Sequence, residues 1–247
     1  MTTLLFYKNI VALDREQHKS LKIRPARHMK FAGEATVLPI VVGEFFEIAR
    51  QCPIAFLRLE DQSLLPVALV GLPGGKNLYL DEKGQWNAPY VPAYVRRYPF
   101  VFAETGPDQL TLCIDHDYEG FNEKEGVALF EEGGKPSALV QGALDMLSEY
   151  QRQSALTQAF VQRLQAADIL IQANANASLS DGRSLSLQGL LVVDDKKFRA
   201  IPEGTLKDWF ASGDLGLVYA HLMSMGNLLE LLRRQPDPSR GARGSVH

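Results

Sequence analysis

The pattern of hydrophobic and polar positions changes near the middle of the chain. In the first half, apolar residues come in short runs bounded by turn residues, a pattern typical of strands. Residues 54–59 and 64–72 flank the turn signal Asp61-Gln62-Ser63 and predict an antiparallel hairpin. Residues 100–102 and 110–114 predict another pair. We therefore expect the first half to be a meander of short antiparallel strands.

Other segments of the first half are less regular. Residues 3–11, 21–24 and 78–80 are further strand candidates. Residues 43–50 contain good helix formers with apolar residues at positions 45, 46 and 49. This spacing predicts one helix that buries that face.

The second half has helical periodicity. Apolar residues recur at helical spacing from Leu139 to Leu164, which predicts one long helix. Ser137 is its expected N-cap, because a serine hydroxyl can accept a hydrogen bond from a free N–H of the first turn. We expect Leu144 and Leu147 to be buried on the apolar face.

The rest of the second half mixes turns and helices. Residues 177–195 predict a β-hairpin that turns at Asp181-Gly182, with residues 190–193 continuing its second arm. Residues 202–210 predict a short helix, and residues 215–234 predict the last one.

Together these elements predict an α+β fold. The expected organisation is a strand-rich lobe over residues 1–135 and a helix-rich lobe with a β-hairpin over residues 136–235. Residues 236–247 are rich in proline, glycine, arginine and serine, which predicts a disordered tail.

The composition narrows the choice of partner and location. Of 247 residues, 46% are hydrophobic and 22% are charged, as in a globular protein, and the formal net charge is −3. A nucleic-acid binder usually carries a basic excess, so nucleic acid is not an expected partner. We see no signal peptide at the N-terminus and no apolar run of about 20 residues that would span a membrane. We therefore expect a cytoplasmic protein without a transmembrane segment.

The segment Tyr90–Phe100 has the most informative composition, with three tyrosines, two adjacent arginines and two prolines. Proline is excluded from the interior of helices and sheets, so we expect extended backbone followed by a turn. Arginine offers a planar fork for carboxylates and phosphates, and tyrosine gives rigid contact area. We predict that the segment binds an anionic group of a peptide or small ligand. The candidate residues are Tyr90, Tyr94, Arg96, Arg97 and Tyr98.

In an extended segment only one of the two arginines would face such a site, because successive side chains point to opposite sides. The structural alternative is an edge strand whose arginines pair with nearby aspartate or glutamate side chains.

His221 is the other candidate site residue. It lies in the last predicted helix, at the edge of the apolar face. It can be a core histidine satisfied by hydrogen bonds, or a general base or ligand, since imidazole titrates near working pH. Asp115-His116-Asp117 is interpreted as a solvated acidic loop, because the spacing does not supply the ligands of a metal site.

Other common site patterns are absent from the sequence. Residues 73–77 lack the spacing of a phosphate loop, and there is no G-x-S-x-G motif. Cys52 and Cys113 form no C-x-x-C pair, and we expect both to be buried free thiols. We expect no cofactor and no metal.

Blocks along most of the chain resemble the bacterial SapC family in order and spacing. The resemblance runs from about Val11 to Arg234. It is carried by residues 66–72, 77–81, Gly84, Trp86, 90–100, 112–115, Gly126, Leu129, Phe130, Tyr150, Gln151, Leu187, Gly189, Val193, Asp194, 219–222, Ser224, Gly226 and Asn227.

The resemblance implies an accessory role and no established reaction. The family takes its name from a bacterial surface-layer gene locus, and its members tend to be encoded beside tryptophan-halogenase-like proteins and TonB-dependent receptors. It therefore implies an accessory or peptide- or protein-binding protein linked to surface-layer or outer-membrane processes. The alternative is an enzyme with a site formed by the Tyr90–Tyr98 segment and His221. A deep pocket with convergent polar groups would favour the enzyme.

Overall fold

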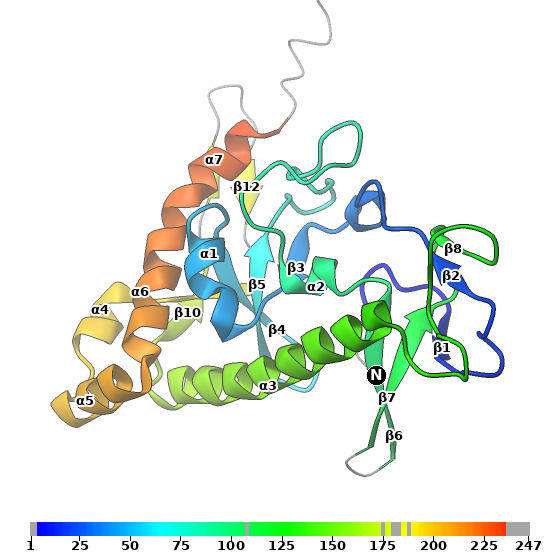
Figure 1. Ribbon diagram of the computed structural model, residues 1–247. Coiled ribbons are helices and arrows are strands. Elements are labelled where there is room, and N and C mark those ends of the chain that lie inside the picture. Colours follow the sequence, from blue (N-terminus) through cyan, green and yellow to red (C-terminus); the bar gives the residue numbers. More distant parts are fainter. Residues whose placement is uncertain (1–3, 107–108, 174–175, 179–183, 187–188, 236–247) are drawn as a thin grey trace, which may run out of the picture.

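The structure is a computed structural model that describes residues 4–106, 109–173, 176–178, 184–186 and 189–235 (Figure 1). It has an α+β fold, with most of the strands in the first half and most of the helices in the second. Every strand pairing between described residues is antiparallel. The predicted fold class is confirmed.

The largest sheet has five strands, and its members come from both halves of the chain. The β4–β5 hairpin runs in register from Ile54↔Ala68 to Arg58↔Leu64, as the sequence predicts. From one edge to the other, the order is β10 (Leu170–Gln172), β13 (Leu190–Val193), β4 (Ile54–Arg58), β5 (Leu64–Leu69) and β3 (Val37–Pro39).

Three smaller sheets complete the strand structure. The predicted pair at residues 100–114 is confirmed as the β6–β7 hairpin, whose strand β7 also pairs with β1. The strands are β1 (Ile10–Ala12), β6 (Phe100–Gly106) and β7 (Gln109–Asp115) in one sheet; β2 (Lys22–Ile23), β8 (Phe121–Asn122) and β9 (Val127–Ala128) in another; and β11 (Asn176–Ser178) with β12 (Ser184–Ser186).

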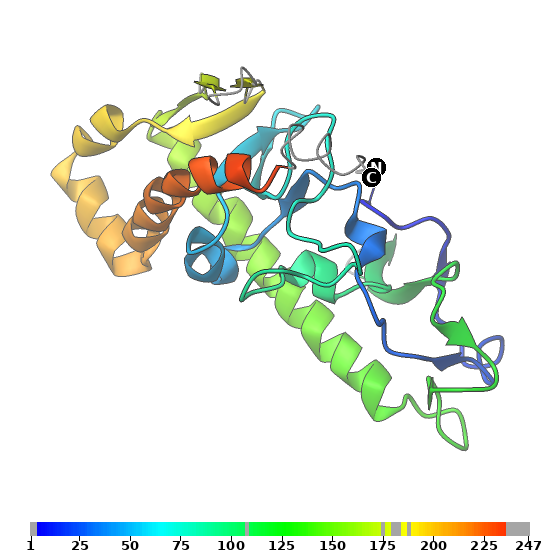
Figure 2. The same ribbon diagram turned by 90° about the horizontal axis from the view of Figure 1, so that it is seen from above.

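The long helix α3 (Ala138–Ala166) connects two parts of the core. Ser137 is its N-cap and accepts a hydrogen bond from the Val140 N–H, as predicted. Leu164 lies in the main core beside the five-stranded sheet, whereas Leu147 lies in a second cluster beside β6 and β7. Figures 1 and 2 show α3 running from the β6–β7 end of the molecule towards the end where α5 and α6 lie. Leu147 is buried as expected, but Leu144 is only half-buried.

The other helices are short. They are η1 (Lys30–Ala32), η2 (Val42–Glu44), α1 (Phe45–Ala49), α2 (Ala93–Arg96), α4 (Asp195–Arg199), α5 (Glu203–Ser212), α6 (Asp214–Ser224), η3 (Met225–Asn227) and α7 (Leu228–Arg233). The predicted last helix is therefore interrupted by a 3₁₀ turn. Asn227, in that turn, donates its side-chain N–H to the Ala49 carbonyl at 2.8 Å, which ties the turn to α1.

Several local predictions were wrong. Of the strand expected at residues 3–11, only the last two described positions are part of β1, and residues 78–80 form no strand but one isolated bridge, Leu80↔Trp86. In α1 the buried residues are Phe45 and Ile48, and the helix packs on α6 and β4, while Phe46 is 60% exposed.

The predicted β-hairpin is present as β11 and β12, although its turn lies outside the described residues. Residues 190–193 do not continue its second arm. They form β13, which pairs with β10 and β4, after Gly189 has reoriented the chain with a φ of 84°. The left-handed backbone there favours glycine.

By length and composition alone, the helical stretch Asp214–Arg233 could cross a membrane, with a mean hydropathy of 1.3. The sequence interpretation did not identify this stretch. In the structure 33% of it is buried, and α6 packs on α1, β4 and β13. Core packing accounts for part of this apolar composition, since Val218 and Leu231 are buried, whereas Tyr219, Met223 and Leu229 are exposed.

Candidate functional site

The Tyr90–Phe100 segment is helical at its centre, so the prediction of an extended backbone was wrong. Residues Ala93–Arg96 form α2, with Pro92 at the N-cap. Proline is tolerated at the start of a helix, where its missing N–H would have no helical partner. Pro99 comes after the helix and follows a cis peptide bond. The two prolines therefore flank the helical turn and do not interrupt it.

A buried carboxylate fixes the start of α2. Glu44 is 4% exposed, and its Oε1 accepts hydrogen bonds from the Ala93 N–H at 2.6 Å and from the Tyr90 hydroxyl at 2.8 Å. Its Oε2 accepts from the Val41 N–H at 3.2 Å. Burial raises the pKa of Glu44, and these hydrogen bonds act in the opposite direction. One side chain thus satisfies the first N–H of α2 and links it to η2.

Arg96 faces outward from this arrangement. Its Nη2 donates to the Tyr90 hydroxyl at 3.0 Å, and its Nε donates to the Val91 carbonyl at 2.9 Å. Burial, followed by the Glu44 carboxylate, raises the pKa of Tyr90 to about 12. The hydroxyl therefore stays protonated and connects Arg96 to Glu44.

Arg97 faces inward and is 8% exposed. Its guanidinium carbon lies 4.1 Å from the ring centroid of Tyr94, 4.8 Å from that of Tyr150 and 5.8 Å from that of Tyr7. We call these three rings the Arg97 cage. Cation–π contacts of this kind contribute about 2 kcal/mol or more each when desolvated.

The cage supplies no negative charge. No carboxylate among the described residues lies within ion-pair distance of Arg97, and its Nε has no hydrogen-bond partner there. Burial raises the pKa of Tyr7 and of Tyr150, while the Arg97 charge opposes that rise, so both rings are neutral. Burying a cation costs several kcal/mol, and the cation–π contacts offset part of that cost without supplying an opposite charge. Arg97 is therefore a buried cation without a counter-ion in the described structure.

Tyr98 and Asp115 hold the N-terminal segment against the cage. Asp115 is fully buried and accepts hydrogen bonds from the N–H groups of Lys8 and Asn9, at 3.1 and 2.9 Å, and from the Tyr98 hydroxyl at 3.0 Å. The interpretation of Asp115 as part of a solvated loop was therefore wrong. Its strand, β7, pairs with β1 and places the carboxylate beneath residues 8 and 9. This arrangement positions Tyr7 next to Arg97.

A hollow of about 350 Å³ lies beside the cage. We call it the α3 hollow. Arg97 is among its lining residues, and Met146 and Leu147 of α3, which also line it, lie about one helical turn before Tyr150 of the cage. Figures 1 and 2 both show α2 beside α3. The other lining residues are Ile23, Pro25, Ala26, Met29, Phe31, Val95, Arg96, Tyr98, Pro99, Phe100, Tyr118, Leu139, Gly142 and Ala143.

His221 lies in a different part of the molecule. It is fully buried, its Nε2 accepts a hydrogen bond from the Val193 N–H at 3.0 Å, and its ring lies 5.3 Å from that of Phe56. Burial lowers its pKa to about 4, so the imidazole is neutral near pH 7. The contacts of His221 are with β4 and β13 and include no residue of the Arg97 cage, so the structure does not bring it together with the Tyr90–Tyr98 segment.

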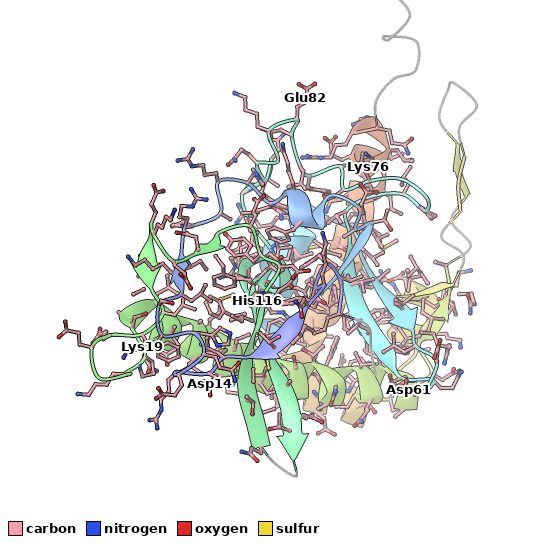
Figure 3. All side chains as sticks on the ribbon, turned by 90° about the vertical axis from the view of Figure 1, so that its right-hand side faces the viewer. Asp14, Lys19, Asp61, Lys76, Glu82 and His116 are labelled. Atoms are coloured by element: carbon pink, nitrogen blue, oxygen red, sulfur yellow. The ribbon has the colours of Figure 1, made fainter. Side chains whose placement is uncertain are left out.

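The acidic loop after β7 holds no metal-binding cluster. His116 and Asp117 are exposed, and the His116 ring lies 6.3 Å from that of His18. Figure 3 shows His116 on the strand-rich face near Asp14. Within the part of the chain that the structure describes, no group of three or more His, Cys, Asp or Glu side chains could hold a metal ion. Cys52 and Cys113 are buried free thiols, as predicted.

Four residues of this region were not identified as site residues from the sequence: Tyr7, Glu44, Asp115 and Tyr150. Tyr150 has the spacing of a core position on α3, and Tyr7 lies in an irregular segment. Glu44 gives the clearest available signal, because a carboxylate between Val41 and Phe45 is a polar residue in an otherwise apolar stretch. A buried carboxylate requires hydrogen-bond donors nearby.

The fold and the site define an α+β protein with an enclosed arginine next to an apolar hollow. The chain belongs to the SapC family, whose model matches residues 13–231. No protein with a curated description and no solved structure gives a significant match.

Proposed function

We propose that this SapC-family protein is a non-catalytic binding protein, and that its ligand is a peptide or small molecule with an anionic group bound by Arg97. Following the family resemblance, we further propose that it acts in the cytoplasm as an accessory protein for surface-layer or outer-membrane processes. The observation that supports the binding role is the buried Arg97 guanidinium, which has no carboxylate partner among the described residues.

The reason is electrostatic. A buried cation loses its hydration, and only an opposite charge with well-placed hydrogen bonds compensates for that loss. The tyrosine rings of the cage provide polarisable contact but no charge. An anionic ligand group would provide the missing opposite charge and acceptors for the guanidinium N–H groups.

The enzyme alternative has less support. It requires a base or nucleophile beside the Tyr90–Tyr98 segment, and His221, its candidate base, is enclosed between α6 and the five-stranded sheet. The hydroxyls of Tyr90 and Tyr98 have raised pKa values, first through burial and then through the carboxylates beside them. These hydroxyls therefore stay protonated near pH 7, and neither is a phenolate nucleophile.

The test compares wild type with Arg97→Gln, using Arg152→Gln as the control, because Arg152 is an exposed arginine on α3. Each protein is incubated with a cell extract containing peptides and metabolites, separated from unbound material, and its bound species are identified by mass spectrometry. We expect species with an anionic group to be bound by wild type and Arg152→Gln, and reduced about tenfold or more in Arg97→Gln. Equal recovery by all three proteins, or no recovered species, would overturn the proposal.

A further inference from the structure

We infer that the ligand is a free carboxylate on an apolar body, with the carboxylate against Arg97 and the body in the α3 hollow. This inference rests on the proposed function and narrows it to a chemical class. An apolar residue at the free C-terminus of a peptide has this chemistry, and so does a free acyl or aromatic acid.

The first argument for this ligand is the position of Arg97. Arg97 lines the hollow, and its cage ring Tyr150 follows Met146 by one turn of α3. The guanidinium therefore belongs both to the cage and to the lining of the hollow. A ligand that reaches Arg97 can fill the hollow with the rest of its length.

The second argument is the apolar lining of the hollow. Apart from the two arginines, its side chains are aliphatic, aromatic or thioether groups, and none is a carboxylate. The Tyr98 and Tyr118 hydroxyls are already engaged with Asp115 and with the Arg24 carbonyl. A sugar or nucleotide would lose its hydration there without finding hydrogen bonds, whereas an apolar body loses nothing of that kind. A volume of about 350 Å³ falls within the range of small-molecule sites.

The third argument is the availability of Arg97. Arg96 also lines the hollow, but its Nε and Nη2 donate to the Val91 carbonyl and the Tyr90 hydroxyl, whereas Arg97 is buried without a carboxylate partner among the described residues. A guanidinium binds one carboxylate through two parallel hydrogen bonds.

Gly142 allows the hollow to be filled without disturbing the fold. It is an exposed residue of α3 that lines the hollow, and a Cβ placed there meets no heavy atom within 4 Å. Leucine also favours helix more than glycine does. Gly142→Leu should therefore fold and occupy part of the hollow while leaving Arg97 unchanged. Gly204→Leu is the matched control, because Gly204 is an exposed helical glycine of α5 with equally open surroundings.

The probes are octanoate, octanamide, and the peptide Gly-Gly-Leu with a free or an amidated C-terminus, each titrated by calorimetry. We expect octanoate, the free-acid peptide or both to bind wild type and Gly204→Leu. Binding should weaken by about tenfold or more for the amide of the same probe, for Arg97→Gln and for Gly142→Leu. Octanoate alone would identify a free acid as the ligand source, and the peptide alone would identify a C-terminus.

The two proposals can fail separately. If the extract yields anionic species that depend on Arg97, but neither acid binds or Gly142→Leu binds as well as wild type, the carboxylate-and-hollow inference is wrong and the proposed function stands. If Arg97→Gln binds acids and extract species as wild type does, both are wrong.

Discussion

Arg96 and Arg97 are adjacent in sequence but have opposite environments. Arg96 is exposed and hydrogen-bonded to Tyr90, whereas Arg97 is buried among three tyrosine rings. The sequence predicted that one arginine would serve a site, on the basis of strand alternation. The cause is instead helical, because adjacent residues of a helix lie about 100° apart around its axis. The two arginines therefore differ in hydration: the Arg96 side chain is exposed to solvent, whereas the Arg97 side chain is buried.

Burial also leads to a pH prediction for His221. Its pKa is lowered to about 4 from 6.5 by burial, so the folded state binds fewer protons than the unfolded state between those values. The contribution of His221 to the free energy of unfolding should therefore be complete above about pH 6.5. It should fall by roughly 3 kcal/mol as the pH decreases to about 4.

The measurement is urea unfolding of wild type and His221→Gln across that pH window. The glutamine side chain of this variant would keep an acceptor for the Val193 N–H but cannot titrate, so the stability difference between the two proteins should shrink as the pH falls. Burial raises the pKa of Glu44, which gives the opposite slope, but that contribution is common to both proteins and cancels in the difference. Parallel curves would show that folding does not lower the pKa of His221.

At the scale of elements, α2 and α3 build the site. α3 supplies Tyr150 and one wall of the hollow, and α2 supplies Tyr94 and ends at Arg97, its C-cap residue. α2 has only four residues, so its own hydrogen bonds cannot hold it in place. Contacts from outside, chiefly Glu44, therefore decide where Arg97 points.

Replacing Leu147 tests the role of α3 as a support. Leu147 is 3% exposed and packs in the cluster beside β6 and β7, so Leu147→Ala should lower the free energy of unfolding by about 2–5 kcal/mol. Leu156→Ala is the control on the same helix, because Leu156 is 46% exposed, and it should change stability by less than about 0.5 kcal/mol. Chemical denaturation measures both. Equal effects would mean that the two faces of α3 are equally buried.

Replacing Glu44 tests how α2 is held. Glu44→Gln removes the charge from a carboxylate that accepts three hydrogen bonds and leaves a single acceptor oxygen, so we expect a loss of about 1–3 kcal/mol. Glu47→Gln is the control, because Glu47 is exposed and paired with Arg50, and it should cost at most about 1 kcal/mol. Chemical denaturation of the two variants decides the matter. A larger loss for Glu47→Gln would contradict this role of Glu44.

The sequence predicted elements better than it predicted the site. The long helix, the β4–β5 hairpin and the β6–β7 hairpin follow from local periodicity and turn residues, and all three are confirmed. The surroundings of Arg97 depend on residues 7, 94 and 150, which are far apart in the chain. No local pattern encodes such a contact. Burial of Asp115 is likewise decided by the pairing of β7 with β1.

At the scale of the molecule, the two halves of the chain share structure. β13, from the second half, pairs with β4, from the first, in the five-stranded sheet. α3 contributes Leu164 to the main core and Leu147 to the second cluster. The five-stranded sheet therefore contains strands from both sides of the division at residue 135 that the sequence suggested. α3 packs in both hydrophobic clusters. Separate unfolding of either half would expose the pairing edge of β4 or β13 and one face of α3.

We therefore expect the chain to unfold as one cooperative unit, and its two tryptophans can test this. Trp86 reports on the first half and Trp209, which is 3% exposed, reports on the second. In Trp86→Phe and Trp209→Phe the remaining tryptophan gives a single local signal, to be followed in urea alongside circular dichroism of the same variant. The fluorescence and circular dichroism midpoints should coincide within each variant, because loss of the β4–β13 pairing removes support from both halves at once. A fluorescence midpoint that departs from the circular dichroism midpoint of the same variant would show that the halves unfold independently.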